Sequence, residues 1–365
     1  MANIQFNTII YFINYPIFVK ILVKNIKMKY FKSLILLFFI ITACKTSEKN
    51  KTHFTIAFGS CINQVLENTL WTAIEKNNPD VWIWGGDIIY SDTDDMNYME
   101  QNYLKQKSNA AYSNFIKNMD VLATWDDHDY GVNDGGFEYA QKETAQELFL
   151  DFFDVPVNDA RRQQEGIYFA KDYTFDNNSI KIILLDTRYF RTALTQDTLT
   201  DKRYKPNVYG EGTMLGETQW KWLENELIKS KASFNIIVSS IQFLSAEHGY
   251  ESWGNMPHEI EKLENLLRNT KAKNAIILSG DRHISEISKK EIEGLNYPLI
   301  DFTSSGMTHS FTNYNGEPNK FRIVDVVSEK SFGILKVDFE TNTVQMEIRG
   351  ENNVIYNAIE QKYKL

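Results

Sequence analysis

Residues 125–134 read Trp-Asp-Asp-His-Asp-Tyr-Gly-Val-Asn-Asp, and they directly follow the apolar run Val-Leu-Ala-Thr at 121–124. An apolar run of this kind is typical of a buried strand. The four aspartates that follow would repel one another unless a cation lay among them. Aspartate oxygen and histidine nitrogen are also common ligands of divalent and trivalent metals. The stretch therefore predicts a metal site at the C-terminal end of a strand, with a solvated acidic turn as the alternative.

Apolar runs end in polar segments at several other points along the chain. These runs cover residues 54–58, 81–84, 180–185, 236–238, 275–278 and 299–302. Between them, apolar residues recur with helical spacing at 66–74, 145–152 and 260–267, which predicts amphipathic helices. Alternating strands and helices indicate an α/β protein with a largely parallel or mixed sheet.

Ligands of open α/β sheets bind outside the carboxyl ends of the strands. Three short segments stand at such ends: Gly-Ser-Cys at 59–61, Gly-Asp-Ile-Ile-Tyr at 86–90 and Gly-Asp-Arg-His at 280–283. Taken singly, each polar residue could be a turn former, a core side chain or a helix cap. Their recurrence on successive strands favours one shared site. We expect six side chains to converge there: Cys61, Asp87, Tyr90, Asp127, Asp281 and His283.

The C-terminal region has a different pattern. Residues 332–339, 343–349 and 354–362 alternate apolar and polar side chains around Gly and Asn turns. This alternation predicts an antiparallel meander that completes a sheet rather than a separate domain. Residues 192–213 and 312–320 show no clear pattern, and we expect loops that shape access to the site.

The N-terminal region has the features of an export signal. The apolar run 34–41 is preceded by Lys29 and Lys32 and is followed by Thr-Ala-Cys at 42–44. A basic region, a short apolar core and small residues before the cut are typical of a secretory signal, and the core is short for a membrane span. The last residues resemble the lipobox of bacterial lipoproteins, which makes Cys44 the candidate lipidation site.

We therefore expect residues 1–44 to be a signal and anchor segment with Met28 as its true start, 45–51 a linker, and 52–365 the folded domain. A longer anchor that includes residues 9–23 is the alternative. The protein would then be exported and attached by lipid to a membrane of the cell envelope, on the periplasmic or cell-surface side.

The charge balance limits the possible partners. The chain has 39 basic and 48 acidic residues, and five of the lysines lie in residues 1–44, which hold no acid. The remainder carries a formal net charge of −14. This charge argues against nucleic acid as a partner, because phosphate backbones need a basic surface. It does not exclude a small phosphorylated substrate.

The two cysteines, Cys44 and Cys61, could form a disulfide in an exported protein. If Cys44 carries lipid, however, Cys61 is left unpaired. Because a thiolate binds iron and zinc well, Cys61 is then either a metal ligand or a buried core thiol. Both interpretations stay open at this point.

Taken in order, the segments resemble the alkaline phosphatase D (PhoD-like) family of metallophosphatases over roughly residues 52–340. The matching pieces are 59–61, 86–90, 125–134, Asp-Thr-Arg-Tyr-Phe-Arg at 186–191, 280–283 and Thr-Ser-Ser-Gly-Met-Thr-His at 303–309. The resemblance implies a metallophosphoesterase-like four-layer sandwich, in which two mixed β-sheets are flanked by helices.

The resemblance also implies a binuclear metal centre with Fe³⁺ and Ca²⁺, or other divalent metals. Asp87 would bridge the two ions, and three side chains would complete the iron site: Cys61, Tyr90 and His283. Asp281 would hold the second ion together with Asn133 or Asp127. An aspartate at position 281 suits a hard ion such as Ca²⁺.

The chemistry implied is attack on phosphorus by a metal-activated hydroxide. His128 is the candidate to protonate the leaving group, although it could instead be a hydrogen-bond partner of a ligand. Arg282, or Arg188 with Arg191, would grip phosphate oxygens, but each arginine could also be a structural ion-pair partner.

We therefore expect a phosphoester hydrolase of the alkaline phosphatase type that acts, as a monomer, on a small phosphorylated substrate. A phosphodiesterase or phospholipase-type activity is the first alternative. The second is a non-catalytic, metal-bound surface lipoprotein that binds a glycan or a partner, for which the 13% aromatic content could supply contacts.

Overall fold

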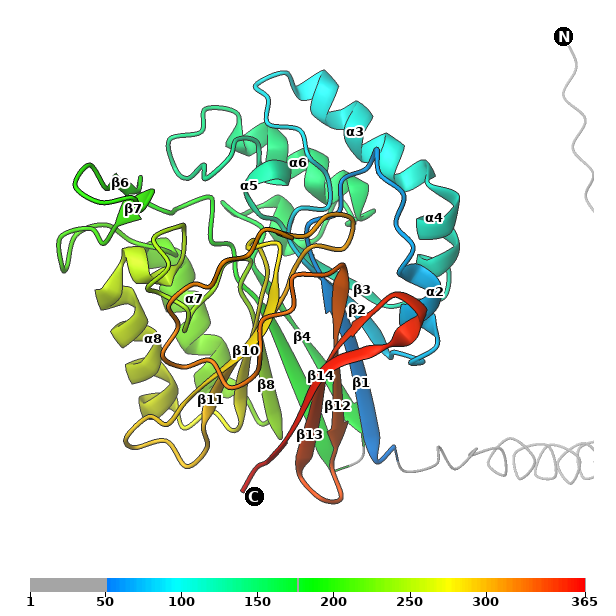
Figure 1. The fold of residues 1–365 in the computed structure, drawn as a ribbon, viewed down its shortest axis with the longest axis vertical. Coiled ribbons are helices and arrows are strands. Elements are labelled where there is room, and N and C mark those ends of the chain that lie inside the picture. Colours follow the sequence, from blue (N-terminus) through cyan, green and yellow to red (C-terminus); the bar gives the residue numbers. More distant parts are fainter. Residues whose placement is uncertain (1–50, 176, 365) are drawn as a thin grey trace, which may run out of the picture. The chain divides into compact units, whose positions relative to one another are not determined.

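Two six-stranded β-sheets form the frame of the protein (Figure 1). The structure is a computed structural model that describes residues 51–175 and 177–364. The predicted signal segment, with Met28 and Cys44, lies outside these described residues. Among the helices that the structure describes, none has the length and apolarity needed to cross a membrane.

The first sheet has the strand order β14-β13-β12-β1-β2-β3. Strands β1, β2 and β3 run parallel, and β12 pairs antiparallel with β1 and leads into β13 and β14. The predicted C-terminal meander is thus confirmed as part of this sheet. The strands are β1 (His53–Gly59), β2 (Val81–Gly85), β3 (Val121–Thr124), β12 (Ser331–Asp338), β13 (Thr343–Gly350) and β14 (Ile355–Lys362).

The second sheet has the order β10-β11-β9-β8-β5-β4. Its four central strands are parallel, and the two edge strands are antiparallel to their neighbours. The strands are β4 (Phe169–Phe175), β5 (Asn178–Leu184), β8 (Phe234–Val238), β9 (Ala275–Ser279), β10 (Ser285–Lys290) and β11 (Leu299–Ser304). A separate two-stranded ribbon pairs β6 (Thr195–Gln196) with β7 (Tyr204–Lys205).

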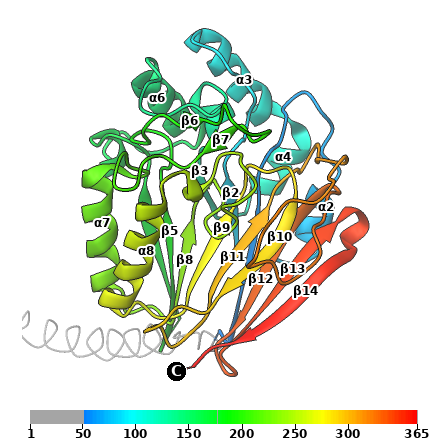
Figure 2. The same ribbon diagram turned by 60° about the vertical axis from the view of Figure 1, so that its left-hand side comes forward.

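Helices cover the outer faces of both sheets (Figures 1 and 2). Side chains of α2, α4 and α6 pack with the tryptophans of β2, whereas α7 and α8 pack on the second sheet. The helices are α2 (Trp71–Glu75), α3 (Met96–Ser108), α4 (Ala110–Ile116), α5 (Asp127–Tyr130), α6 (Lys142–Phe152), α7 (Gly216–Lys229) and α8 (Pro257–Thr270).

Strand β2 shows how the layers are held together. Trp82 and Trp84 point to the helices and Ile83 points to the space between the sheets, because successive strand residues face opposite sides. Between the sheets, Phe58 meets Phe302 edge to face, with ring centroids 4.8 Å apart. The order helix, sheet, sheet, helix confirms the predicted four-layer sandwich of two mixed sheets.

The Asp/His run after β3 folds into the single helical turn α5. The backbone N–H of Asp126 donates to the Asp129 carboxylate at 2.6 Å, which closes the start of the turn. Asp129 also accepts the backbone N–H groups of Asp87 at 3.3 Å and Ile88 at 3.1 Å. This carboxylate therefore binds the turn after β3 to the loop after β2.

Candidate metal centre and active site

Four of the predicted site residues have left-handed backbone conformations at strand ends. The φ angles are 60° for Cys61, 52° for Asp87, 69° for Asp281 and 53° for His283. Each such angle costs a non-glycine residue of order 1–3 kcal/mol, and strain of this kind concentrates at functional sites. The sharp turns let side chains from separate strands point into one region.

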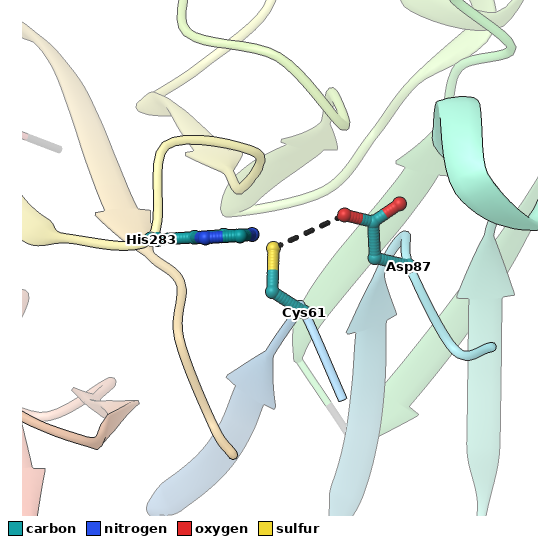
Figure 3. Close-up of side chains that lie close together, drawn as sticks. All are labelled: Cys61, Asp87 and His283. Carbon is teal, nitrogen blue, oxygen red and sulfur yellow. Dashed lines mark hydrogen bonds between the residues drawn. The ribbon is translucent and has the colours of Figure 1, made fainter. Parts of the chain in front are cut away.

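The first cluster joins residues from three loops (Figure 3). The Cys61 Sγ lies 3.2 Å from Asp87 Oδ2, and the Tyr90 hydroxyl donates to the same oxygen at 3.1 Å. The Tyr90 hydroxyl also lies 2.9 Å from His283 Nε2. Ligand atoms of Cys61, Asp87 and His283 all lie within 4.8 Å of one another. The structure thus brings together the four residues predicted for the iron site.

A second cluster lies beside the first. Ligand atoms of Asp126, Asp127 and Asp281 lie within 4.8 Å of one another, and Asp87 forms a similar group with Asp127 and His128. Asp87 therefore shares one group with Cys61 and His283 and another with Asp127 and His128, and Asp127 connects it to the group that contains Asp281. Asn133 is exposed and lines the same cavity as Asp127. Both predicted candidates for the remaining ligand of the second ion therefore lie at this cavity.

These residues fit metal ions by the chemistry of their donor set. Burial raises the pKa of Asp281, and burial and the Cys61 charge raise that of Asp87, in both cases well above the usual range. Burial likewise raises the pKa of the Cys61 thiol to about 11. Asp126 Oδ2 has no hydrogen-bond partner within residues 51–175 and 177–364. Buried carboxylates and a thiol so arranged lack a positive charge that bound cations would supply.

Asp127 differs from its neighbours because nearby groups favour its charge. Burial alone would raise its pKa, but the Arg188 and His128 charges lower it to about 2. The backbone N–H of Asp134 also donates to its Oδ2 at 2.7 Å. These contacts favour the ionised form of Asp127 in the folded protein, which is the form that can bind a cation.

His128 is held in place by a residue that the sequence did not indicate. Its Nδ1 lies 2.7 Å from Asp92 Oδ2, and its ring stacks on Tyr90 with centroids 4.1 Å apart. Burial opposes protonation of the ring, but the Asp87 charge and the Asp92 hydrogen bond raise the His128 pKa to about 11. Asp92 lies in the acidic segment Ser-Asp-Thr-Asp-Asp, 91–95, which has the composition of an ordinary polar loop.

The prediction that Arg188 and Arg191 grip the substrate is wrong. Both side chains are fully buried, and neither lines the cavity. Arg188 Nε donates to Asp126 at 2.7 Å and its Nη1 donates to Glu251 at 2.6 Å, while Arg191 Nε lies 2.9 Å from Glu251. Two arginines neutralise two buried carboxylates, so neither guanidinium is free for a phosphate.

A cavity of about 230 Å³ opens beside both clusters. Its lining residues are Asp127, His128, Asn133, Asp134, Arg203, Tyr250, Glu251, Asp281, Arg282, His283 and Phe311. Arg282, predicted to contact phosphate, is one of these lining residues. Arg203 was missed, because a lone arginine in the unpatterned segment 192–213 carries no local signal. It pairs with Asp134 at 2.7 Å.

The four-layer sandwich with paired clusters of metal-ligand side chains at the strand ends defines the metallophosphoesterase-like class of folds. The model of the PhoD-like phosphatase family matches residues 56–347. The chain therefore belongs to the PhoD-like phosphatase family, and the resemblance noted in the sequence is confirmed.

Individual relatives agree with this family. Alkaline phosphatase D of Bacillus subtilis (strain 168) is 22% identical over 299 residues, which cover 67% of this chain and 48% of that protein. The chain thus spans about half the length of this curated relative. A solved structure of PhoD aligns with a TM-score of 0.67 and 17% identity, covering 86% of this chain and 69% of that one.

A second solved structure shares the fold. It is GAP50, described as the anchor in the inner membrane complex of Plasmodium, and it aligns with a TM-score of 0.55 and 12% identity. The alignment covers 86% of this chain and 90% of GAP50. At these identities, both structural alignments are evidence of a common fold alone.

Proposed function

We propose that this chain is a metal-dependent phosphoester hydrolase that turns over a small phosphorylated substrate in the 230 Å³ cavity. The observation that carries the proposal is that Asp87 forms one group of ligand atoms with Cys61 and His283 and another with Asp127 and His128. Asp127, His128 and His283 line that cavity. Membership of the PhoD-like phosphatase family supports the same reaction class.

In this proposal Cys61, Asp87, Tyr90 and His283 hold one ion, for which we propose Fe³⁺. Asp87 and Asp281, with Asp127 or Asn133, hold the second, for which we propose Ca²⁺. When bound, two such ions would offset the charge of phosphate oxygens and lower the pKa of water, so that hydroxide is available as a nucleophile at neutral pH.

The chain's own residues would bind the ester and supply a proton to its leaving oxygen. The Asp92 contact occupies His128 Nδ1, which leaves Nε2 to donate a proton to the leaving oxygen from the cavity wall. Arg282, on the same wall, has fork-shaped donors suited to phosphate oxygens. The wall is closed by Tyr250 and Phe311, whose rings are partly exposed.

The reaction class is tested with two chromogenic esters, p-nitrophenyl phosphate and bis(p-nitrophenyl) phosphate. Metal-dependent release of p-nitrophenol by the purified protein supports the proposal, and the ratio of the two rates gives the monoester or diester preference. Full metal occupancy without turnover of either compound would contradict the proposed hydrolase function and favour a metal-bound binding protein.

Replacing Asp92 by asparagine should lower kcat by roughly 10- to 100-fold, because general acids contribute about 10²- to 10⁴-fold and only the orientation and charge of His128 change. The Michaelis constant should change little, since Asp92 lies outside the cavity lining. Asp94→Asn is the matched control: it removes an exposed charge from the same loop. Equal kcat values for the two variants would contradict the role of Asp92.

The purified protein should show a tyrosinate-to-iron(III) charge-transfer band that disappears in Tyr90→Phe. Burial and the Asp87 charge raise the pKa of Tyr90 well above its usual range, so its phenolate forms at neutral pH only with a cation beside it. Tyr250→Phe, which changes a tyrosine of the cavity wall, should keep the band. A colourless protein that contains zinc would refute the iron assignment.

A further inference from the structure

Glu286 on β10 is a buried carboxylate outside both clusters of metal-ligand side chains. Its side chain is 1% exposed. One oxygen accepts hydrogen bonds from Gln242 Nε2 at 2.8 Å and from Asn319 Nδ2 at 3.0 Å. The other accepts from Arg322 Nε at 2.5 Å. This carboxylate is tightly held, because Arg322 is its charged partner and losing that partner would leave the buried charge uncompensated.

These contacts connect two loops that contribute to the cavity wall. Gln242 precedes the segment that carries Tyr250. Arg322 ends the segment that carries Glu317, and its Nη1 donates to the Glu317 carbonyl oxygen at 3.0 Å. Arg322 Nη2 also donates to the Tyr314 hydroxyl oxygen at 3.0 Å, which accepts the Glu317 N–H at 2.9 Å. Glu286 and Arg322 therefore determine where the backbone of Glu317 lies.

Arg282 lies between the same two loops. Its Nη2 donates to Glu317 Oε1 at 2.7 Å, and its guanidinium lies over the Tyr250 ring, 4.0 Å from the centroid. One contact therefore comes from each loop that Glu286 joins. An arginine side chain loses considerable rotamer entropy when it is ordered. Because these two contacts already order Arg282 in the free protein, less entropy is lost when a substrate binds.

We propose that Glu286 is a positioning residue for substrate binding, which acts through Arg322 and Glu317 on Arg282. The inference rests on the proposed function, in which Arg282 contacts the phosphate. It adds a buried residue on an edge strand to the machinery that determines affinity for the ester.

The test is Glu286→Gln in the metal-loaded protein. The amide keeps the size of the side chain and can still accept from Gln242, but its NH₂ group faces the Arg322 donor. The KM for p-nitrophenyl phosphate should rise roughly three- to tenfold with kcat within about twofold, a coupling typical of residues in one network. In an Arg282→Met background, the same substitution should leave KM unchanged.

Glu347→Gln is the matched control. Glu347 is also 1% exposed, and it accepts from Arg349 Nε at 2.6 Å and Lys336 Nζ at 3.1 Å on the first sheet. It should lose stability much as Glu286→Gln does, with KM unchanged. Arg322→Lys keeps a positive charge beside Glu286 but lacks the guanidinium donors to Tyr314 and Glu317. It should therefore reproduce the rise in KM. This variant tests the inference if Glu286→Gln does not fold.

The inference would be overturned if neither Glu286→Gln nor Arg322→Lys changed KM. It would also be overturned if Glu286→Gln raised KM equally in the Arg282→Met background. Titration calorimetry with inorganic phosphate gives the same comparison without turnover. Failure of the wild-type protein to hydrolyse either ester would therefore count against the proposed function, and phosphate affinity would still decide the role of Glu286.

Discussion

Replacing Asp87 by asparagine should abolish ester hydrolysis, with kcat/KM lower by at least about 10³-fold, because metal-ion stabilisation of the transition state contributes several kcal/mol. Asp87 is the residue shared by the Cys61–His283 and Asp127–His128 groups of ligand atoms. Its loss should therefore reduce the content of both metals, which elemental analysis measures independently of turnover.

The same substitution should leave the metal-free fold intact. Asp87 is 1% exposed, and burial together with the Cys61, Asp127 and Asp126 charges raises its pKa, although the His128 charge lowers it. A neutral amide of the same size avoids a charge that this buried environment disfavours, so the metal-free variant should melt at the same temperature as the metal-free wild type or higher. Full activity, or a folded variant that keeps the normal content of both metals, would refute the central role of Asp87.

Replacing Arg188 by methionine should reduce the free energy of unfolding by about 3–5 kcal/mol, the usual cost of breaking a buried ion pair from one side. Arg188 is fully buried and neutralises both Asp126 and Glu251. Burial raises the pKa of each of these carboxyl groups to about 7 even with the arginine present. Urea denaturation of the metal-free protein measures the change.

Arg203→Met is the matched control for Arg188→Met. Arg203 also pairs with a carboxylate, Asp134 at 2.7 Å, but its side chain is 50% exposed. Its loss should cost less than about 1 kcal/mol, since water screens exposed pairs. If the two variants lost equal stability, the assignment of Arg188 to the scaffold would be wrong.

Much of the fold could be predicted from the sequence because strand signals are local. The apolar runs at 54–58, 81–84 and 121–124 became β1, β2 and β3 with shifts of a residue at most. Strand β4, with its half-exposed residues, and β10, whose polar Ser-Glu-Ile-Ser-Lys-Lys is largely buried, carry weak patterns and were not predicted. They are strands because the sheet beside them supplies hydrogen-bond partners.

The sequence by itself determined the ligand chemistry, since each polar segment directly follows its strand and all parallel strands end at one edge. Only the tertiary structure decided how the charged groups are used. Arg188 meets Asp126 and Glu251 across 62 and 63 residues of chain, and His128 meets Asp92 across 36. Whether an arginine is buried among carboxylates or faces a cavity depends on such distant partners, and no local pattern records them.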